Sequence, residues 1–171
     1  SASTLAQAYT PDAVTSATPL SYIKPAEGAV MTASDIASKL GLSSDHELYR
    51  RMFFGLRSGS IGESAIFLIL LFGAILVVTK IIDWRAPVAM IVTAVAVTWI
   101  AGIDPLLTLL SGGLLFGAVF MATDYATSPV TPWGRLLFGA GAGLISALIR
   151  LYGAYPEGVM FSILIMNAVT P

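Results

Sequence analysis

"ESAIFLILLFGAILVVTKII", residues 63–82, decides the fold of this chain because its charged side chains, Glu63 and Lys80, lie only near its two ends. A helix needs about 20 predominantly apolar residues to cross the hydrocarbon core of a bilayer. This stretch therefore predicts a transmembrane helix. Similar apolar runs predict four further spans, at residues 86–102, 105–123, 134–150 and 157–170.

The composition of the chain also indicates a membrane protein. Only 11% of its 171 residues are charged and its mean hydropathy is +0.83, whereas a soluble domain has about 25% charged residues. The segment 1–60 nevertheless holds five of the nine basic and five of the ten acidic residues. We therefore expect an all-α membrane protein in two parts. A polar loop with a short amphipathic helix occupies residues 1–60, and a bundle of about five transmembrane helices occupies residues 61–171.

The absence of some residue types excludes several kinds of site. With no cysteine, the chain by itself cannot form disulfides, cysteine-ligated iron–sulfur clusters or a catalytic thiolate. With one histidine we expect no multi-histidine metal site, and we identify no catalytic residue. The net charge of −1 argues against a nucleic-acid partner. A redox role for this chain would therefore need an organic cofactor.

The stretch "SSDHELYRRMFFGL", residues 43–56, predicts the amphipathic helix. Ser44 and Glu47 have the spacing of a capping box, which begins a helix. Behind them an apolar side chain recurs every four residues, at Leu48, Met52 and Leu56. We expect this helix to lead to the membrane, with its arginines at the lipid headgroups.

Two glycine pairs predict close helix packing within the bundle. Gly113 with Gly117 and Gly139 with Gly143 each form a G-x-x-x-G pattern, which lets helix backbones approach closely in lipid. The basic residues fall into two groups at opposite ends of the spans. One group is Lys80, Arg85 and Arg135, and the other is Arg150 with Arg50, Arg51 and Arg57.

The acidic residues of the bundle all lie at span ends, at Glu63, Asp83, Asp104, Asp124 and Glu157. No carboxylate lies in the middle of a span, where it would mark an ion relay. We therefore expect any ion path to lie at an interface with another chain or helix half. Unwound backbone at residues 59–62 or 128–132 is the expected source of ion-binding carbonyls.

Two of these carboxylates have more than one interpretation. Glu63 is a favourable charge at a helix N-terminus, and a role in ion passage is the alternative hypothesis. Asp124 is interpreted as a helix-end cap, with ion or ligand binding at the inner turn as the alternative.

The segment "DAVTSAT", from Asp12 to Thr18, resembles the attachment motif of covalent FMN, D-x-x-[ST]-G-A-[TS]. Asp12, Thr15, Ala17 and Thr18 match the motif, and Ser16 replaces its usual glycine. In proteins with this motif a flavin transferase joins the FMN phosphate to the last hydroxyl, which here belongs to Thr18. The alternative interpretation is a plain linker rich in serine and threonine.

Three further stretches occur in the order found in one family: "FFGLRSGSIGES" at 53–64, "FMATDYATSPVT" at 120–131 and "YPEGVMFSILIMNAVTP" at 155–171. With the flavin motif, they make the chain resemble the second half of the D subunit of the Rnf complex. That family is similar to the B subunit of the sodium-pumping NADH:quinone reductase. Tyr125 departs from the family, which commonly has proline there, and the family's first five spans are missing. A start without methionine and an end inside an apolar run also indicate a fragment.

The resemblance implies a membrane subunit of a redox-driven ion pump. The Rnf complex passes electrons between reduced ferredoxin and NAD and couples this transfer to sodium or proton translocation. The D subunit would carry covalent FMN on Thr18, exchange electrons with the FMN-bearing G subunit and assemble with the NAD-side C subunit. The missing half is associated with riboflavin.

The resemblance also implies a location, the bacterial or archaeal inner membrane, with residues 1–60 outside and Lys80, Arg85 and Arg135 inside. The competing hypothesis is half of a channel or secondary transporter without a redox cofactor, because glycine-rich and broken helices suit that class equally well.

Overall fold

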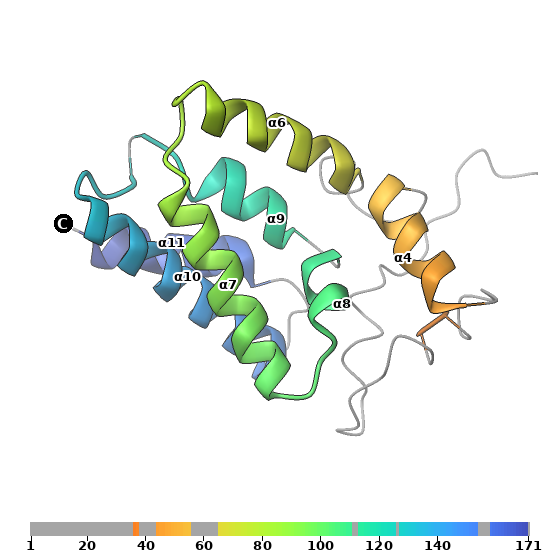
Figure 1. Ribbon diagram of the computed structural model, residues 1–171. Helices are drawn as coiled ribbons and strands as arrows, with labels where there is room; N and C mark the ends of the chain where they lie inside the picture. The colour runs from red at the N-terminus through yellow and green to blue at the C-terminus, as the bar shows by residue number, and fades with distance from the viewer. Residues whose placement is uncertain are drawn as a thin grey trace, which may run out of the picture.

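The computed structural model describes residues 36–37, 44–55, 65–110, 113–125, 127–153 and 158–170. Within these ranges every regular element is a helix, which confirms the all-α prediction (Figure 1). In chain order the helices are α4 (Asp45–Phe54), α6 (Ile66–Val78), α7 (Arg85–Ile100), α8 (Pro105–Leu110), α9 (Leu114–Phe116), the π-helix η1 (Gly117–Met121), α10 (Pro132–Tyr152) and α11 (Val159–Val169).

Helices α7 and α10 form the most extensive helix pair (Figure 1). A methyl group added at Gly139 or Gly143 of α10 would overlap the backbone carbonyl of Ala86 or Met90 in α7. Gly117 similarly lies against the side chain of Val159 in α11. The prediction of close helix packing is therefore confirmed for Gly139 and Gly143, and also for Gly117, whereas Gly113 lies at the non-helical start of α9.

This close contact predicts that Gly143→Ala destabilises the bundle. The new methyl group would meet backbone, which cannot rotate away, so we expect a loss of about 2–3 kcal/mol in the free energy of unfolding. Gly141→Ala on the same helix is the matched control, because it would meet only the flexible end of the Met166 side chain. Thermal unfolding of the two variants in detergent should show a clearly lower midpoint for Gly143→Ala alone. Equal midpoints would contradict this account of the helix pair.

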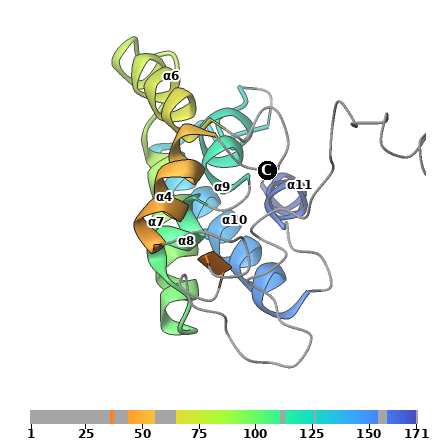
Figure 2. The same cartoon turned by 90° about the vertical axis from the view of Figure 1, so that its right-hand side faces the viewer.

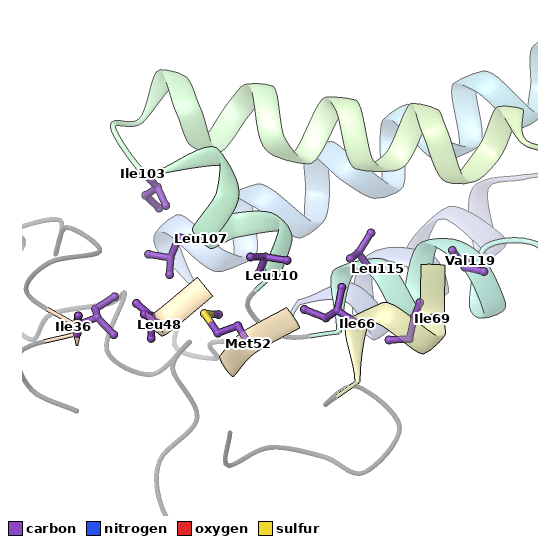
Figure 3. Close-up of a cluster of buried hydrophobic side chains, with 11 residues drawn as sticks. Ile36, Leu48, Met52, Ile66, Ile69, Ile103, Leu107, Leu110, Leu115 and Val119 are labelled. Atoms are coloured by element: carbon purple, nitrogen blue, oxygen red, sulfur yellow. The ribbon is translucent and has the colours of Figure 1, made fainter. Parts of the chain in front are cut away.

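The amphipathic helix α4 is built as predicted. The Ser44 hydroxyl accepts the backbone N–H of Glu47 at 3.3 Å and so begins the helix, and Gly55, in the left-handed conformation with φ 81°, ends it. Its apolar face is buried, with Leu48 and Met52 fully inside. Figure 3 shows these two side chains in a row of buried residues that continues through Ile66 of α6. Helix α4 therefore packs on α6 and α8 (Figure 2).

The third expected span, residues 105–123, is not one helix, and this prediction is wrong. The structure divides it into α8, α9 and η1, with residues 111–112 outside the described ranges. The sequence there is Ser-Gly-Gly, and glycine costs about 1 kcal/mol relative to alanine in a helix interior. Gly113 has a ψ of 12°, outside the helical range. A run of apolar residues predicts burial in lipid but does not require a continuous helix.

Among the described residues, one helix is long and apolar enough to cross a membrane, Pro132–Tyr152. Three shorter apolar helices accompany it, Ile66–Val78, Arg85–Ile100 and Val159–Val169. The count of five spans stays a prediction. The structure does place aromatic residues at both ends of α10, with Trp133 and Tyr152 exposed and about 28 Å apart along a helix that rises ~1.5 Å per residue. That separation is close to the thickness of a hydrocarbon core.

Candidate functional site

A chain of buried hydrogen bonds crosses the bundle beside the interrupted third segment. Arg150 of α10, only 6% exposed, donates from Nη1 to the backbone carbonyl of Thr108 in α8 at 3.1 Å. The Thr108 hydroxyl donates to the hydroxyl of Thr98 in α7 at 3.1 Å. The Thr98 hydroxyl in turn donates to the carbonyl of Ala94 at 2.8 Å. Three helices are thus joined by polar contacts inside an otherwise apolar core.

The position of Arg150 is explained by the end of α8. Thr108 lies in the last turn of α8, which the structure describes as Pro105–Leu110. The guanidinium donates to its carbonyl, and the positive charge lies at the negative end of the helix dipole. A charge within an apolar bundle is costly and is retained for a structural or functional reason. The buried arginine therefore joins α10 to the last turn of α8.

The sequence placed Arg150 at the same end of the spans as Arg50, Arg51 and Arg57, but the burial of its side chain was not predicted. The signal that would have found it is periodicity along α10. Gly139, Gly143, Ser146 and Arg150 recur at spacings of four, three and four residues and are all buried. Because glycine, serine and arginine do not form an apolar stripe, the inward-facing side of α10 was not visible from hydropathy.

The π-helix η1 lies on the other side of the interruption. Its defining hydrogen bond runs from the N–H of Ala122 to the carbonyl of Gly117 at 2.7 Å. Single π-turns occur frequently at functional sites, because they shift the register of backbone carbonyls. Irregular backbone at membrane depth is tolerated where it is buried in protein or lines a cavity. The π-helix η1 is thus the described backbone best suited to binding an ion.

Two stretches, residues 59–62 and 128–132, were expected to supply ion-binding carbonyls, and the structure describes only the second. Residues 59–62 lie outside the described ranges. Residues 128–132 form the turn before α10, and there the Pro129 carbonyl accepts the side-chain Nε–H of Arg135 at 2.9 Å. That carbonyl therefore already has a cationic partner.

A second polar site lies at the end of the bundle where α6 ends and α7 and α10 begin. Arg135 Nη1 donates to Asp83 Oδ2 at 2.6 Å, and Arg85 Nη1 lies 3.3 Å from the same oxygen. The pKa of Asp83 lies below its usual value, chiefly because the Arg85 backbone N–H donates to the carboxylate. Burial opposes this shift, and the hydrogen bond from Arg135 and the charges of both arginines add to it. These contacts border a cavity of about 490 Å³.

The lowered pKa predicts the effect of Asp83→Asn. A carboxylate whose pKa is lower in the folded state stabilises the protein above its unfolded pKa, and this contribution is lost as pH falls through the folded pKa. We expect Asp83→Asn to cost about 1 kcal/mol near pH 7, since the ion pairs are partly exposed. The difference from wild type should begin to shrink as the pH falls below the ordinary pKa of an aspartate, about 3.9, and should disappear only below the lowered pKa of the folded state. Unfolding midpoints measured from pH 7 down into this acidic range check this, and a deficit that does not change with pH would show that the charge of Asp83 is not responsible.

Of the predicted site residues, the structure describes only Asp124. Asp12, Thr15, Ala17, Thr18 and Glu63 lie outside the described ranges.

Asp124 lies exposed in the turn between η1 and α10. Its carbonyl accepts the N–H of Ser128 at 3.0 Å, and its carboxylate lies 3.4 Å from the Thr127 hydroxyl. The residue that caps α10 is Thr131, whose hydroxyl accepts the N–H of Gly134 at 3.1 Å. The interpretation of Asp124 as a helix-end cap stays a prediction.

Helix α4 is the described helix nearest in sequence to the flavin motif. The Tyr49 hydroxyl donates to Asp104 Oδ2 at 2.7 Å and fixes α4 to the loop before α8. Burial and this contact raise the pKa of Tyr49, so the phenol stays protonated. Phe53 packs near Phe67 of α6 with ring centroids 6.0 Å apart, whereas Phe54 is 60% exposed. Phe54 is therefore the aromatic side chain of α4 that is available to a flavin ring.

Comparison with known proteins identifies the family. Residues 2–171, almost the whole chain, match the NQR2, RnfD, RnfE family. The chain belongs to this family. One curated relative is the D subunit of the proton-translocating ferredoxin:NAD(+) oxidoreductase complex of Clostridium ljungdahlii. It is 46% identical to this chain over 167 residues. The alignment covers 94% of the chain and 48% of that relative.

Other family members have similar sequence identities to this chain. The D subunit of the Na(+)-translocating ferredoxin:NAD(+) oxidoreductase complex of Acetobacterium woodii is 41% identical, with 96% of the chain and 48% of the relative covered. The D subunit of the ion-translocating oxidoreductase complex of Stutzerimonas stutzeri is 45% identical over 70% of the chain and 36% of the relative. The chain thus spans about half the length of the first two relatives. The resemblance to the family of Rnf D subunits is confirmed, and relatives of comparable identity are named for different ions.

Proposed function

We propose that this chain is the flavin-bearing half of the D subunit in an Rnf-type, redox-driven ion pump. It relays electrons through FMN bound covalently to Thr18, and the complex couples this transfer to sodium or proton translocation. The observation that carries the proposal is the family match over residues 2–171, because the matched range includes the motif from Asp12 to Thr18. The subunit is not catalytic alone.

The residues of the motif suit the attachment chemistry. The Thr18 oxygen forms a bond to the FMN phosphorus of a flavin dinucleotide, the pyrophosphate bond breaks, and a nucleoside monophosphate and the hydroxyl proton leave. Small neighbours such as Ala17 leave room for a transferase, and Pro19 disfavours helix at Thr18. The bound flavin accepts and donates electrons, while the protein positions it. Arg50, exposed on α4, is a candidate partner for its phosphodiester.

The interrupted third segment is the proposed place of cation passage. Helices that are broken within the membrane expose carbonyls that bind ions in many transporters. Here the π-helix η1 supplies such backbone, and Arg150 donates to a carbonyl in the last turn of α8. The fixed positive charge of Arg150 would keep a passing cation on the η1 side of the break. No carboxylate among the described residues lies within the apolar helices.

The proposed assembly and orientation follow the family. The partners are the other subunits of an Rnf-type complex, in particular the FMN-bearing G subunit and the NAD-side C subunit, together with a flavin transferase and the lipid bilayer. The flavin loop faces outside, and riboflavin belongs to the half of the D subunit beyond this chain. The clustering of Lys80, Arg85 and Arg135 at one end of the bundle supports an inner location for that end.

The second candidate function is half of a channel or secondary transporter without a redox cofactor. The interrupted third segment favours this class as much as it favours an ion pump. Ultraviolet-excited fluorescence of the denatured protein, purified from cells that contain the transferase, separates the two. A fluorescent band with a peptide mass that includes FMN supports the flavin-bearing pump. A dark band and an unmodified peptide around Thr18 would support the transporter.

A further inference from the structure

The cavity near Asp83 has the composition of an anion site. Its volume is about 490 Å³. Its lining includes three cations, Lys80, Arg85 and Arg135, and a single carboxylate, Asp83. The formal charge of these four groups is three minus one, or +2. Helices α7 and α10 begin at this end of the bundle, so their positive dipole ends add to the same field (Figure 1).

The three cations are not equivalent. Asp83 already binds Arg135 at 2.6 Å and Arg85 at 3.3 Å. In the described part of the chain, the ammonium group of Lys80 makes no ion pair and no hydrogen bond with a side chain. Lys80 is therefore the cation of this cavity that is available to an external anion.

The backbone of Lys80 has a conformation that is unfavourable for a lysine. Lys80 has a φ of 57°, and among the described residues it is the one non-glycine residue with positive φ. It occupies the position after α6 where a hydrogen bond from the Ile81 N–H to the Leu76 carbonyl (3.0 Å) closes the helix end. Glycine is the usual residue there, and any L side chain costs roughly 1 kcal/mol more. Such strain persists mainly where a function retains it.

The surroundings of the cavity are those of a membrane interface. Trp84, Tyr125 and Trp133 are all exposed at this end of the bundle, which is the pattern of an aromatic belt at headgroup depth. The apolar residues Val77 and Ile81 line the cavity itself. The Tyr125 hydroxyl donates to the Ile81 carbonyl, so the residue that departs from the family pattern joins the two loops that border the cavity. A ligand here would therefore meet cations on one side and apolar side chains on the other.

We propose that this cavity binds the headgroup phosphate of an anionic phospholipid. Lys80 makes the direct ion pair, Arg85 and Arg135 provide the surrounding positive field, and an acyl chain lies along Val77 and Ile81. A free phosphate ion would use the same cations but would gain nothing from the apolar side of the cavity. The proposal depends on the membrane location of this end of the bundle and not on FMN at Thr18.

Three substitutions at Lys80 separate charge from backbone strain. Lys80→Arg keeps both the charge and the strain. Lys80→Gln keeps the strain and removes the charge. Lys80→Gly removes the charge and relieves the strain, so it should fold at least as well as wild type.

The measurement is lipid retention by the purified complex, reconstituted with equal amounts of phosphatidylglycerol and phosphatidylcholine and analysed by native mass spectrometry. We expect the wild type and Lys80→Arg to retain phosphatidylglycerol preferentially. We expect Lys80→Gln and Lys80→Gly to retain roughly five-fold less of it, the effect of about one cation near a membrane surface. The flavin content should not change in any variant, which separates this test from that of the flavin-bearing role.

Two results would overturn the proposal. One is undiminished retention of phosphatidylglycerol by Lys80→Gly with a normal unfolding midpoint. The other is displacement of the lipid by millimolar inorganic phosphate, which would assign the cavity to a soluble anion.

Discussion

We expect Thr18→Val to abolish the proposed covalent flavin and to lower the ultraviolet-excited fluorescence of the denatured protein at least ten-fold. Valine keeps the shape of threonine but has no hydroxyl, so no ester oxygen is present. Thr18→Ser restores a hydroxyl and should restore the fluorescence. Electron transfer by the assembled complex should fall with the flavin content, because the chain has no cysteine or histidine cluster to replace an organic cofactor.

Thr10→Val is the matched control for this substitution. Thr10 lies just before the motif, so its loss removes a similar hydroxyl from the same segment without touching the attachment residue. The peptide that carries Thr18 should have the mass of the FMN adduct in Thr10→Val and the unmodified mass in Thr18→Val. If Thr18→Val stays fluorescent, the flavin is attached elsewhere and the electron-relay role of Thr18 is wrong.

Replacing Arg150 by leucine should destabilise the bundle by about 3 kcal/mol, the largest effect expected for a residue in the described helices. A hydrogen bond with a charged donor contributes about 1.5–3 kcal/mol, and its loss leaves the buried Thr108 carbonyl without this donor. The substitution also removes the positive charge at the end of α8. We therefore expect a lower unfolding midpoint of the purified complex and a strong loss of redox-driven ion uptake into vesicles. The unfolding midpoint and ion uptake of Arg150→Lys should lie between those of wild type and Arg150→Leu. Lysine keeps the positive charge, but its shorter side chain does not extend as far toward the Thr108 carbonyl.

Thr108→Val is the matched control in the same hydrogen-bond chain. Arg150 binds the backbone carbonyl of Thr108, so valine removes the link to the Thr98 hydroxyl and leaves the arginine contact intact. We expect a cost of about 1 kcal/mol. Similar midpoints and similar ion uptake for Thr108→Val and Arg150→Leu would show that Arg150 has no special part in holding the interrupted segment.

Features that depend on neighbouring residues along the chain could be predicted without the fold. Hydropathy identified the apolar helices, the Ser44 cap identified the start of α4, and the spacing of Gly139 and Gly143 identified a tight helix contact. Each of these is a local pattern with a local physical cause. The flavin motif from Asp12 to Thr18 is also local, and it stays a prediction because it lies outside the described residues.

Contacts between distant segments could be found only in the folded chain. Asp83 and Arg135 are 52 residues apart, and Thr108 and Arg150 are 42 apart, so neither contact has a signature in sequence spacing. The interruption of the third segment was hidden because hydropathy measures the preference of side chains for lipid and not the continuity of backbone hydrogen bonds. A buried arginine can donate to a carbonyl of α8 only where another helix brings it close. That pairing depends on how α8 and α10 pack, which the composition of neither helix specifies.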